Sequence, residues 1–331
     1  MPMVATADEP SMRCALRHVA EQVDPAGTAS VWDAVLVVEV PLPWARDITE
    51  AEPFASLCER PVGTITGSDG RTWRPQGIVP DDPDAGVRVI AHEGPSEGVG
   101  PMTRREWLVP PDARADLVAL CRALLEADAP ALERFEGMRD DPPAGTVDVL
   151  LCTHGARDVC CGGSGTALFN EVLAAMDTRH SHARLFRTSH TGGHRFAPTA
   201  LSFPEGVAWA HLDAGTLLAV LAHDGDPATL GPHVRGAVTL GGSHAQVADR
   251  EGFLRWGWDW FTERRSVRCV QGDPSGDASR TEVLAESVSG GSRGVVVDVE
   301  LAGHIPKVPC GEPASGQDPL ESVWRVTGVS T

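Results

Sequence analysis

The sequence contains no tyrosine, and aromatic residues make up only 5% of its 331 residues. No apolar run approaches the roughly 20 residues that a membrane-spanning helix needs, so we expect no membrane anchor. Residues 1–10 lack the basic and apolar regions of a secretory signal peptide. We therefore expect a cytoplasmic protein, whose eight cysteines are reduced thiols or metal ligands rather than disulfides.

Basic residues are scarce: 28 Lys and Arg stand against 46 Asp and Glu, a formal net charge of -18. Such a charge repels nucleic acid and anionic membranes and favours a basic protein partner, such as a reductase. A Cys-x2-Cys pair is also absent, which argues against a thiol oxidoreductase of the thioredoxin type. The glycines of residues 162–166 lack the lysine of a phosphate-binding P-loop and the spacing of a dinucleotide fingerprint.

The chain is long enough for two or three domains, and a proline-rich stretch at residues 140–145 predicts a boundary. We predict an α/β (α+β) protein with an N-terminal α+β domain at 1–145. A thioredoxin-like ferredoxin domain follows at 146–229. Residues 230–331 are predicted to pack a helix, residues 246–263, on an antiparallel sheet.

The first domain is predicted to contain strands at 31–40, 86–93 and 104–109, with helices at 12–23 and 112–127. This order approximates a thioredoxin-like unit, and we interpret the domain as a degenerate copy of that fold. In the second domain the hydrophobic pattern predicts a β-α-β-β-β-α order, whose elements are residues 146–151, 165–176, 183–187, 199–203, 207–211 and 214–223. Its strand ends carry the most informative side chains of the chain.

Two cysteines and two histidines stand on loops at these strand ends: Cys152, Cys161, His190 and His194. Thiolates together with imidazoles suit zinc or an iron–sulfur centre. Structural zinc usually has two to four residues between its cysteines, whereas eight separate this pair. The long loop is more typical of a wrapped cluster. We predict a [2Fe-2S] cluster with both thiolates on one iron and both imidazoles on the other.

Several assignments stay open at this stage. The same four residues could hold Zn²⁺, and Cys160 is an alternative ligand to its neighbour Cys161. Arg157 and Asp158 are predicted to form an ion pair. Three residues are predicted to tune the site through hydrogen bonds or charge, namely His154, Arg157 and Arg195.

Three segments carry a resemblance to a known family: Cys152-Thr-His-Gly-Ala-Arg-Asp158 with Cys161-Gly162, then His190-Thr-Gly-Gly-His-Arg-Phe-Ala197, then Phe203-Pro-Glu-Gly206. Arg13-Cys-Ala15 and Pro43-Trp44 add to it. Residues 11–221 resemble the sucrase/ferredoxin-like family, and the part from Thr146 is similar to thioredoxin-like [2Fe-2S] ferredoxins. The family resemblance implies a His-x3-His pair where those ferredoxins have two cysteines. The name does not establish sucrose cleavage, and we expect none.

The mixed ligand set has a predicted consequence. Two neutral imidazoles in place of two thiolates make the bound cluster less negative, which raises its reduction potential. We expect a one-electron carrier whose reduction is coupled to protonation of His190 or His194. The alternatives are an iron–sulfur redox sensor and a zinc-stabilised Cys2His2 interaction module.

Overall fold

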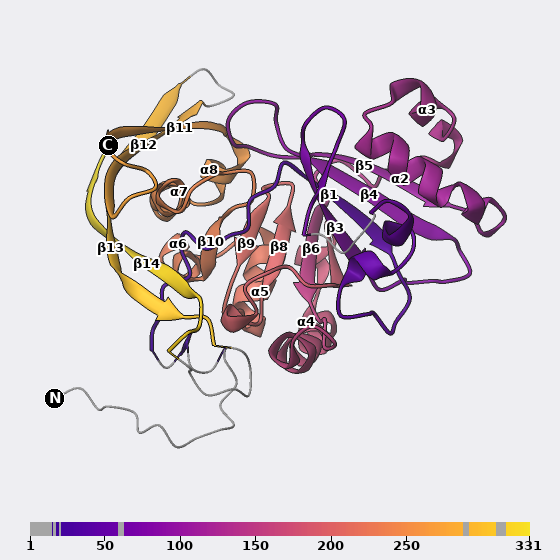
Figure 1. Cartoon of the computed structure of the whole chain (residues 1–331), viewed down its shortest axis with the longest axis horizontal. Helices are drawn as coiled ribbons and strands as arrows, with labels where there is room; N and C mark the ends of the chain where they lie inside the picture. The colour runs from indigo at the N-terminus through magenta and orange to yellow at the C-terminus, as the bar shows by residue number, and fades with distance from the viewer. Residues whose placement is uncertain (1–14, 16–17, 20, 59–62, 287–290, 309–315) are drawn as a thin grey trace.

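Two sheets and their covering helices form an α/β fold in the computed structural model, which describes residues 15, 18–19, 21–58, 63–286, 291–308 and 316–331 (Figure 1). One sheet is mixed and has ten strands, and the other is antiparallel and has four. No helix in these ranges has the length and apolar run that a membrane span needs.

The first half of the ten-stranded sheet has the strand order β3-β1-β4-β5. β1 runs parallel to β3 and antiparallel to β4, which pairs with β5. The elements of this half are β1 (Ala34–Glu39), β2 (Ile65–Thr66), β3 (Thr72–Ile78), β4 (Val87–Glu93), β5 (Thr103–Val109), α2 (Leu117–Leu125) and α3 (Ala129–Glu133).

The second half repeats this order and these directions as β7-β6-β8-β9, with β10 added at the edge. Its elements are β6 (Val147–Cys152), α4 (Thr166–Ala175), β7 (Ala183–Thr188), β8 (Ala200–Phe203), β9 (Val207–Trp209), α5 (Ala214–Ala222), α6 (Pro227–Leu230) and β10 (Val234–Ala237). The halves join where β3 and β7 pair antiparallel at Ile78 and Thr188. The predicted boundary at 145 precedes β6, and β10 carries the sheet beyond residue 229.

Alternating side chains of the strands divide the interior into layers. Leu36 and Val38 of β1 pack under α2, whereas Val35 and Val37 belong to a cluster shared with Leu150 of β6. The inner faces of the two halves therefore pack against each other, and the helices cover the outer faces.

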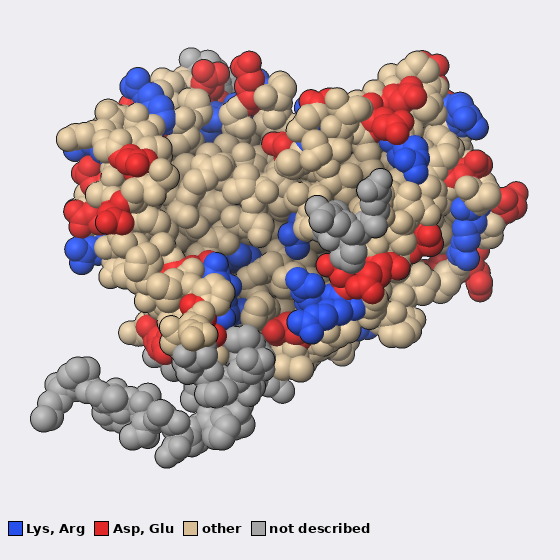
Figure 2. Space-filling model, in the orientation of Figure 1, with Lys and Arg blue, Asp and Glu red and all other residues tan. Residues whose placement is uncertain are grey.

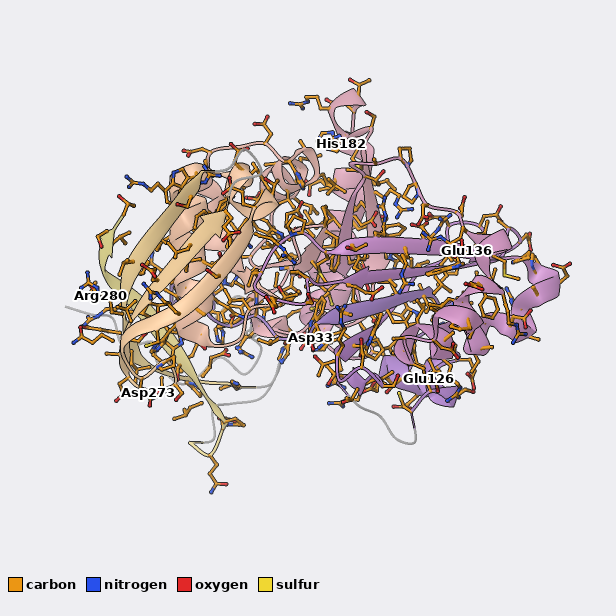
Figure 3. The ribbon with its side chains drawn as sticks, turned by 90° about the horizontal axis from the view of Figure 1, so that it is seen from above. Asp33, Glu126, Glu136, His182, Asp273 and Arg280 are labelled. Carbon is orange, nitrogen blue, oxygen red and sulfur yellow. The ribbon has the colours of Figure 1, made fainter. Side chains whose placement is uncertain are left out.

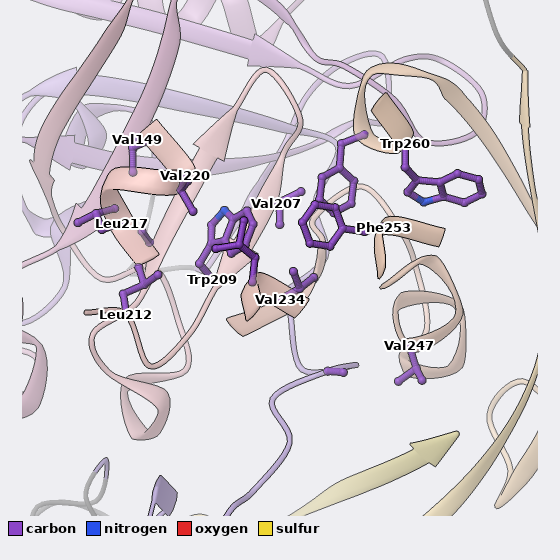
Figure 4. Close-up of a cluster of buried hydrophobic side chains, with 14 of the residues drawn as sticks. Val149, Val207, Trp209, Leu212, Leu217, Val220, Val234, Val247, Phe253 and Trp260 are labelled. Carbon is purple, nitrogen blue, oxygen red and sulfur yellow. The ribbon is translucent and has the colours of Figure 1, made fainter. Parts of the chain in front are cut away.

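A third region closes the outer face of the second half. It contains α7 (Ser243–Trp256), α8 (Trp258–Thr262), β11 (Arg264–Gly272), β12 (Ala278–Glu286), β13 (Ser292–Pro306) and β14 (Leu320–Ser330). Val247 and Phe253 of α7 share one apolar cluster with Trp209 of β9 and Val220 of α5 (Figure 4). Figure 3 shows this sheet, with Asp273 and Arg280, at the opposite end of the molecule from Glu126 and Glu136.

Several elements differ from the sequence predictions. β3 was not predicted, because Pro75 and Gly77 make its sequence look unlike a strand. The connection from β1 to β3 contains short 3₁₀ turns, Ile48–Glu50 and Phe54–Ser56, where a helix would complete the thioredoxin-like order. The predicted helix 246–263 is two helices, because Gly257 adopts φ 64° between them. Of the predicted helix 12–23, Ala15, His18 and Val19 are helical, and much of the remainder lies outside the described residues.

A buried charge network links the two halves across their shared interior. Arg184 of β7 donates to Asp148 of β6 at 2.7 Å and to Glu106 of β5 at 2.7 Å, and neither carboxylate is exposed. His92 of β4 lies 3.3 Å from Asp148. Burial alone would raise the pKa of Asp148, but hydrogen bonds from His92 and Arg184 outweigh it and lower that pKa.

We expect Asp148→Asn to lower the free energy of unfolding at neutral pH by about 3 kcal/mol, because it removes one partner of a buried ion pair. Since the folded pKa is depressed, the contribution of Asp148 is present above its ordinary pKa of 3.8 and is lost as the pH falls below it. Urea unfolding between acid and neutral pH measures both effects. Asp298→Asn, which affects a half-exposed ion pair with Arg280, is the control and should change stability far less. Equal losses in the two variants would contradict this account.

Candidate functional site

The parallel pairing of β6 and β7 brings the candidate ligands to one edge of the sheet. Cys152, the last residue of β6, is the register partner of Thr188, the last residue of β7. The loops that follow carry Cys161 from one strand and His190 and His194 from the other. All four candidates therefore come from two neighbouring loops at the carboxyl ends of parallel strands.

The two thiols lie together in the interior. Cys152 and Cys161 are both fully buried, and the Cys161 thiol donates a hydrogen bond to Cys152. This bond, with a further one to His190, holds the pKa of Cys152 well below its ordinary value in spite of burial. The same shared proton and burial raise the pKa of Cys161. The pair is therefore poised to have one thiolate, the form that binds metal.

A π-helix, Cys161–Gly165, leads directly into α4 and turns Cys161 toward Cys152. A side chain at Gly165 would place its Cβ 2.1 Å from the Cys152 carbonyl oxygen, so this close approach requires glycine. Cys160 is also buried; it belongs to the same cluster of buried side chains as Cys152 and Cys161 and lines a mostly apolar cavity with Ala197 and His211. The hydrogen bond to Cys152 comes from Cys161.

Asp158 joins the two loops. Its Oδ1 accepts from the Cys160 N–H at 2.8 Å, and its Oδ2 lies 2.8 Å from His194 Nδ1. Burial alone would raise the pKa of Asp158, but the His194 hydrogen bond and the backbone N–H groups outweigh it and lower that pKa. A carboxylate on Nδ1 orients the imidazole, as is usual for metal-ligating histidines, whose other nitrogen binds the metal.

His190 is positioned through its backbone. Its N–H donates to His154 Nδ1 at 3.2 Å, and its carbonyl accepts from Arg74 Nη2 at 2.6 Å. The imidazole neighbours that of His194, with ring centroids 6.3 Å apart. Its buried Nδ1 has no hydrogen-bond partner within the described residues. A buried imidazole nitrogen without a partner is uncommon in folded proteins and indicates a role for this ring other than packing.

Two glycines between the histidines make the loop tight, as expected. Gly192 and Gly193 have φ of 87° and 70°, which favour glycine. Arg235 of β10, almost fully buried, donates to the Gly192 carbonyl at 3.1 Å. A Cβ at Gly193 would meet the Arg235 guanidinium carbon at 2.6 Å, so the loop packs directly on this arginine.

The predicted tuning residues have defined positions. His154 is buried, and its Nε2 lies 2.8 Å from the Ala45 carbonyl, which fits the predicted hydrogen-bonding role. Arg195 pairs with Glu321 of β14. The predicted Arg157–Asp158 pair is wrong: Arg157 lies 3.6 Å from Asp47. Asp158 turns inward because His194 and the start of the π-helix hold its carboxylate. Whether Arg157 and Arg195 tune the site stays a prediction.

The donor set can be tested for its fit to a metal group. In the part of the chain that the structure describes, no three His, Cys, Asp or Glu side chains gather as one mononuclear ion requires. The candidates instead form a thiol pair, Cys152 with Cys161, beside an imidazole pair, His190 with His194. Thiolates and imidazoles are donors that both an iron–sulfur centre and zinc accept.

Sequence reasoning missed three residues that hold the site: Asp158 as partner of His194, Arg74 and Arg235. Asp158 lies inside the cysteine loop, so a search for an acidic residue near the predicted ligands could have found it. Arg74 lies in the unpredicted strand β3, and Arg235 stands more than 40 positions from the loop that it contacts. Local sequence carries no signal for either.

Comparisons with known proteins give one family and one relative to report. A family described as sucrase/ferredoxin-like matches residues 25–236. The protein "Altered inheritance of mitochondria protein 32" of Meyerozyma guilliermondii is 41% identical over 59 residues, which are 17% of this chain and 21% of that protein. This chain thus matches about a fifth of that relative's length, and no solved structure matches. Because the family match covers most of the sequence, the chain belongs to the sucrase/ferredoxin-like family.

Proposed function

We propose that this protein carries one [2Fe-2S] cluster and transfers single electrons between redox proteins. Cys152 and Cys161 would hold one iron, and His190 and His194 the other. The observation that carries the proposal is the buried, hydrogen-bonded thiol pair beside two imidazoles on adjacent loops. When bound, the cluster would supply a reversible one-electron acceptor.

The fold offers further support. The two halves of the large sheet have matching strand orders, β3-β1-β4-β5 and β7-β6-β8-β9. In each half the first two strands of the order run parallel. We infer that each half is a thioredoxin-like unit, and that the first half is a degenerate copy without ligands. The end of β1 places Glu39 at the position that Cys152 has in β6.

The chain's own residues have distinct roles in this proposal. Cys152 would bind as the thiolate that its hydrogen bonds already favour. Asp158 would orient His194 through Nδ1, and Arg235 would hold the loop between the histidines. Burial of both cysteines would exclude water from the thiolate side.

Purified protein is expected to contain two irons and two sulfides per chain and to give visible absorption and a rhombic EPR signal on reduction. Cys161→Ser should abolish this content, because its thiol contacts Cys152. Cys160→Ser is the matched control and should keep it, because the hydrogen bond to Cys152 comes from Cys161 and not from Cys160. A colourless zinc protein would overturn the proposal in favour of an interaction module. Loss in Cys160→Ser alone would reverse the ligand assignment.

Asp158→Asn is expected to speed iron loss to a chelator by about 10–100-fold, the usual cost of removing a hydrogen-bond partner of a ligating histidine. Asparagine can still accept the Cys160 N–H, so the loop should fold. Asp177→Asn is the control, because it changes a half-exposed carboxylate that lies 3.0 Å from His180 Nδ1 and outside the two ligand loops. Equal chelation rates in both variants would show that Asp158 does not act on the ligand.

Proton coupling follows from the two imidazoles. The Asp158 carboxylate lies against His194 Nδ1 and favours a proton on that nitrogen. His190 Nδ1 has no hydrogen-bond partner among the described residues. We therefore expect His190 to exchange the proton, and the midpoint potential to fall by up to about 59 mV per pH unit at alkaline pH. Protein-film voltammetry across neutral and alkaline pH measures this slope. A midpoint potential that does not change with pH would exclude proton coupling. The alternative role as a redox sensor would require a midpoint potential that matches the potential of an oxidant.

A further inference from the structure

A small polar cavity lies beside His190, on the side where Arg74 supports the loop. Its volume is about 200 Å³, and its lining includes His190, His154 and three arginines, Arg46, Arg74 and Arg157. The arginines come from separate segments: the loop after β1, strand β3 and the cysteine loop. The fold therefore gathers them, since no short motif does.

The charge of this cavity is opposite to that of the whole chain. Among the described residues that line the cavity there are three arginines and one carboxylate, Asp47, in a protein of net charge -18. Within the described residues neither Arg46 nor Arg74 has a carboxylate within ion-pair distance, and Arg157 reaches Asp47 only at 3.6 Å. Figure 2 shows basic and acidic side chains next to one another in the lower middle of the face drawn, and both kinds along its edges.

The carboxylate of Asp47 is already engaged in local structure. Its Oδ1 accepts from the Thr49 N–H at 3.1 Å and from the Thr49 hydroxyl at 2.7 Å, which caps the turn Ile48–Glu50. Arg74 is likewise fixed, because its Nε donates to Gln76 at 3.2 Å and its Nη2 to the His190 carbonyl. The cavity thus keeps a net positive charge on a prearranged frame.

We propose that this cavity binds a small dianionic oxyanion, of the phosphate or short dicarboxylate type. Planar guanidinium groups bind both anions through paired hydrogen bonds, and three of them converge here. The volume admits such an ion and excludes a nucleotide or a folded peptide. His190, a proposed cluster ligand, lines the cavity, so the expected redox effect of the anion rests on the proposed function. The negative charge of the bound anion disfavours an added electron on the cluster and therefore lowers its midpoint potential.

Calorimetric titration of the full chain at low, constant ionic strength tests binding, with inorganic phosphate and malonate as separate probes and chloride as control. Saturable binding of phosphate, malonate or both is expected. Which of the two probes binds identifies the class of anion that the cavity accepts. Arg46→Gln and Arg157→Gln should each weaken it at least tenfold. Arg325→Gln, an exposed arginine of β14 paired with Glu300, is the matched control and should bind as the parent does. Binding no stronger than that of chloride, or unchanged by either cavity variant, would overturn the proposal.

Cys161→Ser separates this inference from the cluster proposal. It leaves the arginines intact, so anion binding should persist whatever the iron content. An iron-containing protein that binds no anion would refute only the cavity assignment, and an iron-free protein that binds phosphate would refute only the cluster. In the iron-containing form, phosphate should lower the midpoint potential, and Arg157→Gln should remove this shift.

Discussion

The parallel register of β6 and β7 is the constraint on which the site depends. It places Cys152 beside Thr188, so the loops after both strands begin at the same edge of the sheet. β7 also joins the second half of the sheet to the first through β3. The same strand therefore positions the histidine loop and connects the two halves.

Polar side chains then lock the two loops together. Asp158 ties the start of the π-helix to His194, and Arg74 and Arg235 hold the backbone carbonyls of His190 and Gly192. Because these contacts come from both halves, the first half has a structural role at a site to which it contributes no candidate ligand. This is a physical reason for keeping a half that lacks the cysteines and histidines.

Electrostatics differ between the surface as a whole and the neighbourhood of His190. The net charge of -18 suggested a basic partner, yet arginines surround the histidine loop. Keeping arginines close together in the interior disfavours their charged forms. Burial, together with the nearby Arg195 and Arg74, lowers the pKa of Arg235 to about 9. A chain that keeps such arginines near one loop stabilises negative charge there, while the rest of its surface repels it.

Short-range patterns in the sequence determined the strands from β6 to β9, the helix α4, the tight glycine loop and the candidate residues Cys152, Cys161, His190 and His194. Those features depend on hydrophobic periodicity, glycine and ligand chemistry, which are local. Only the tertiary structure decided that β3 joins the sheet despite Pro75, that Asp158 faces His194 rather than Arg157, and that Cys161 forms a hydrogen bond with Cys152. Each of these depends on contacts between segments far apart in sequence or on the direction in which a side chain leaves a turn, and neither leaves a local pattern.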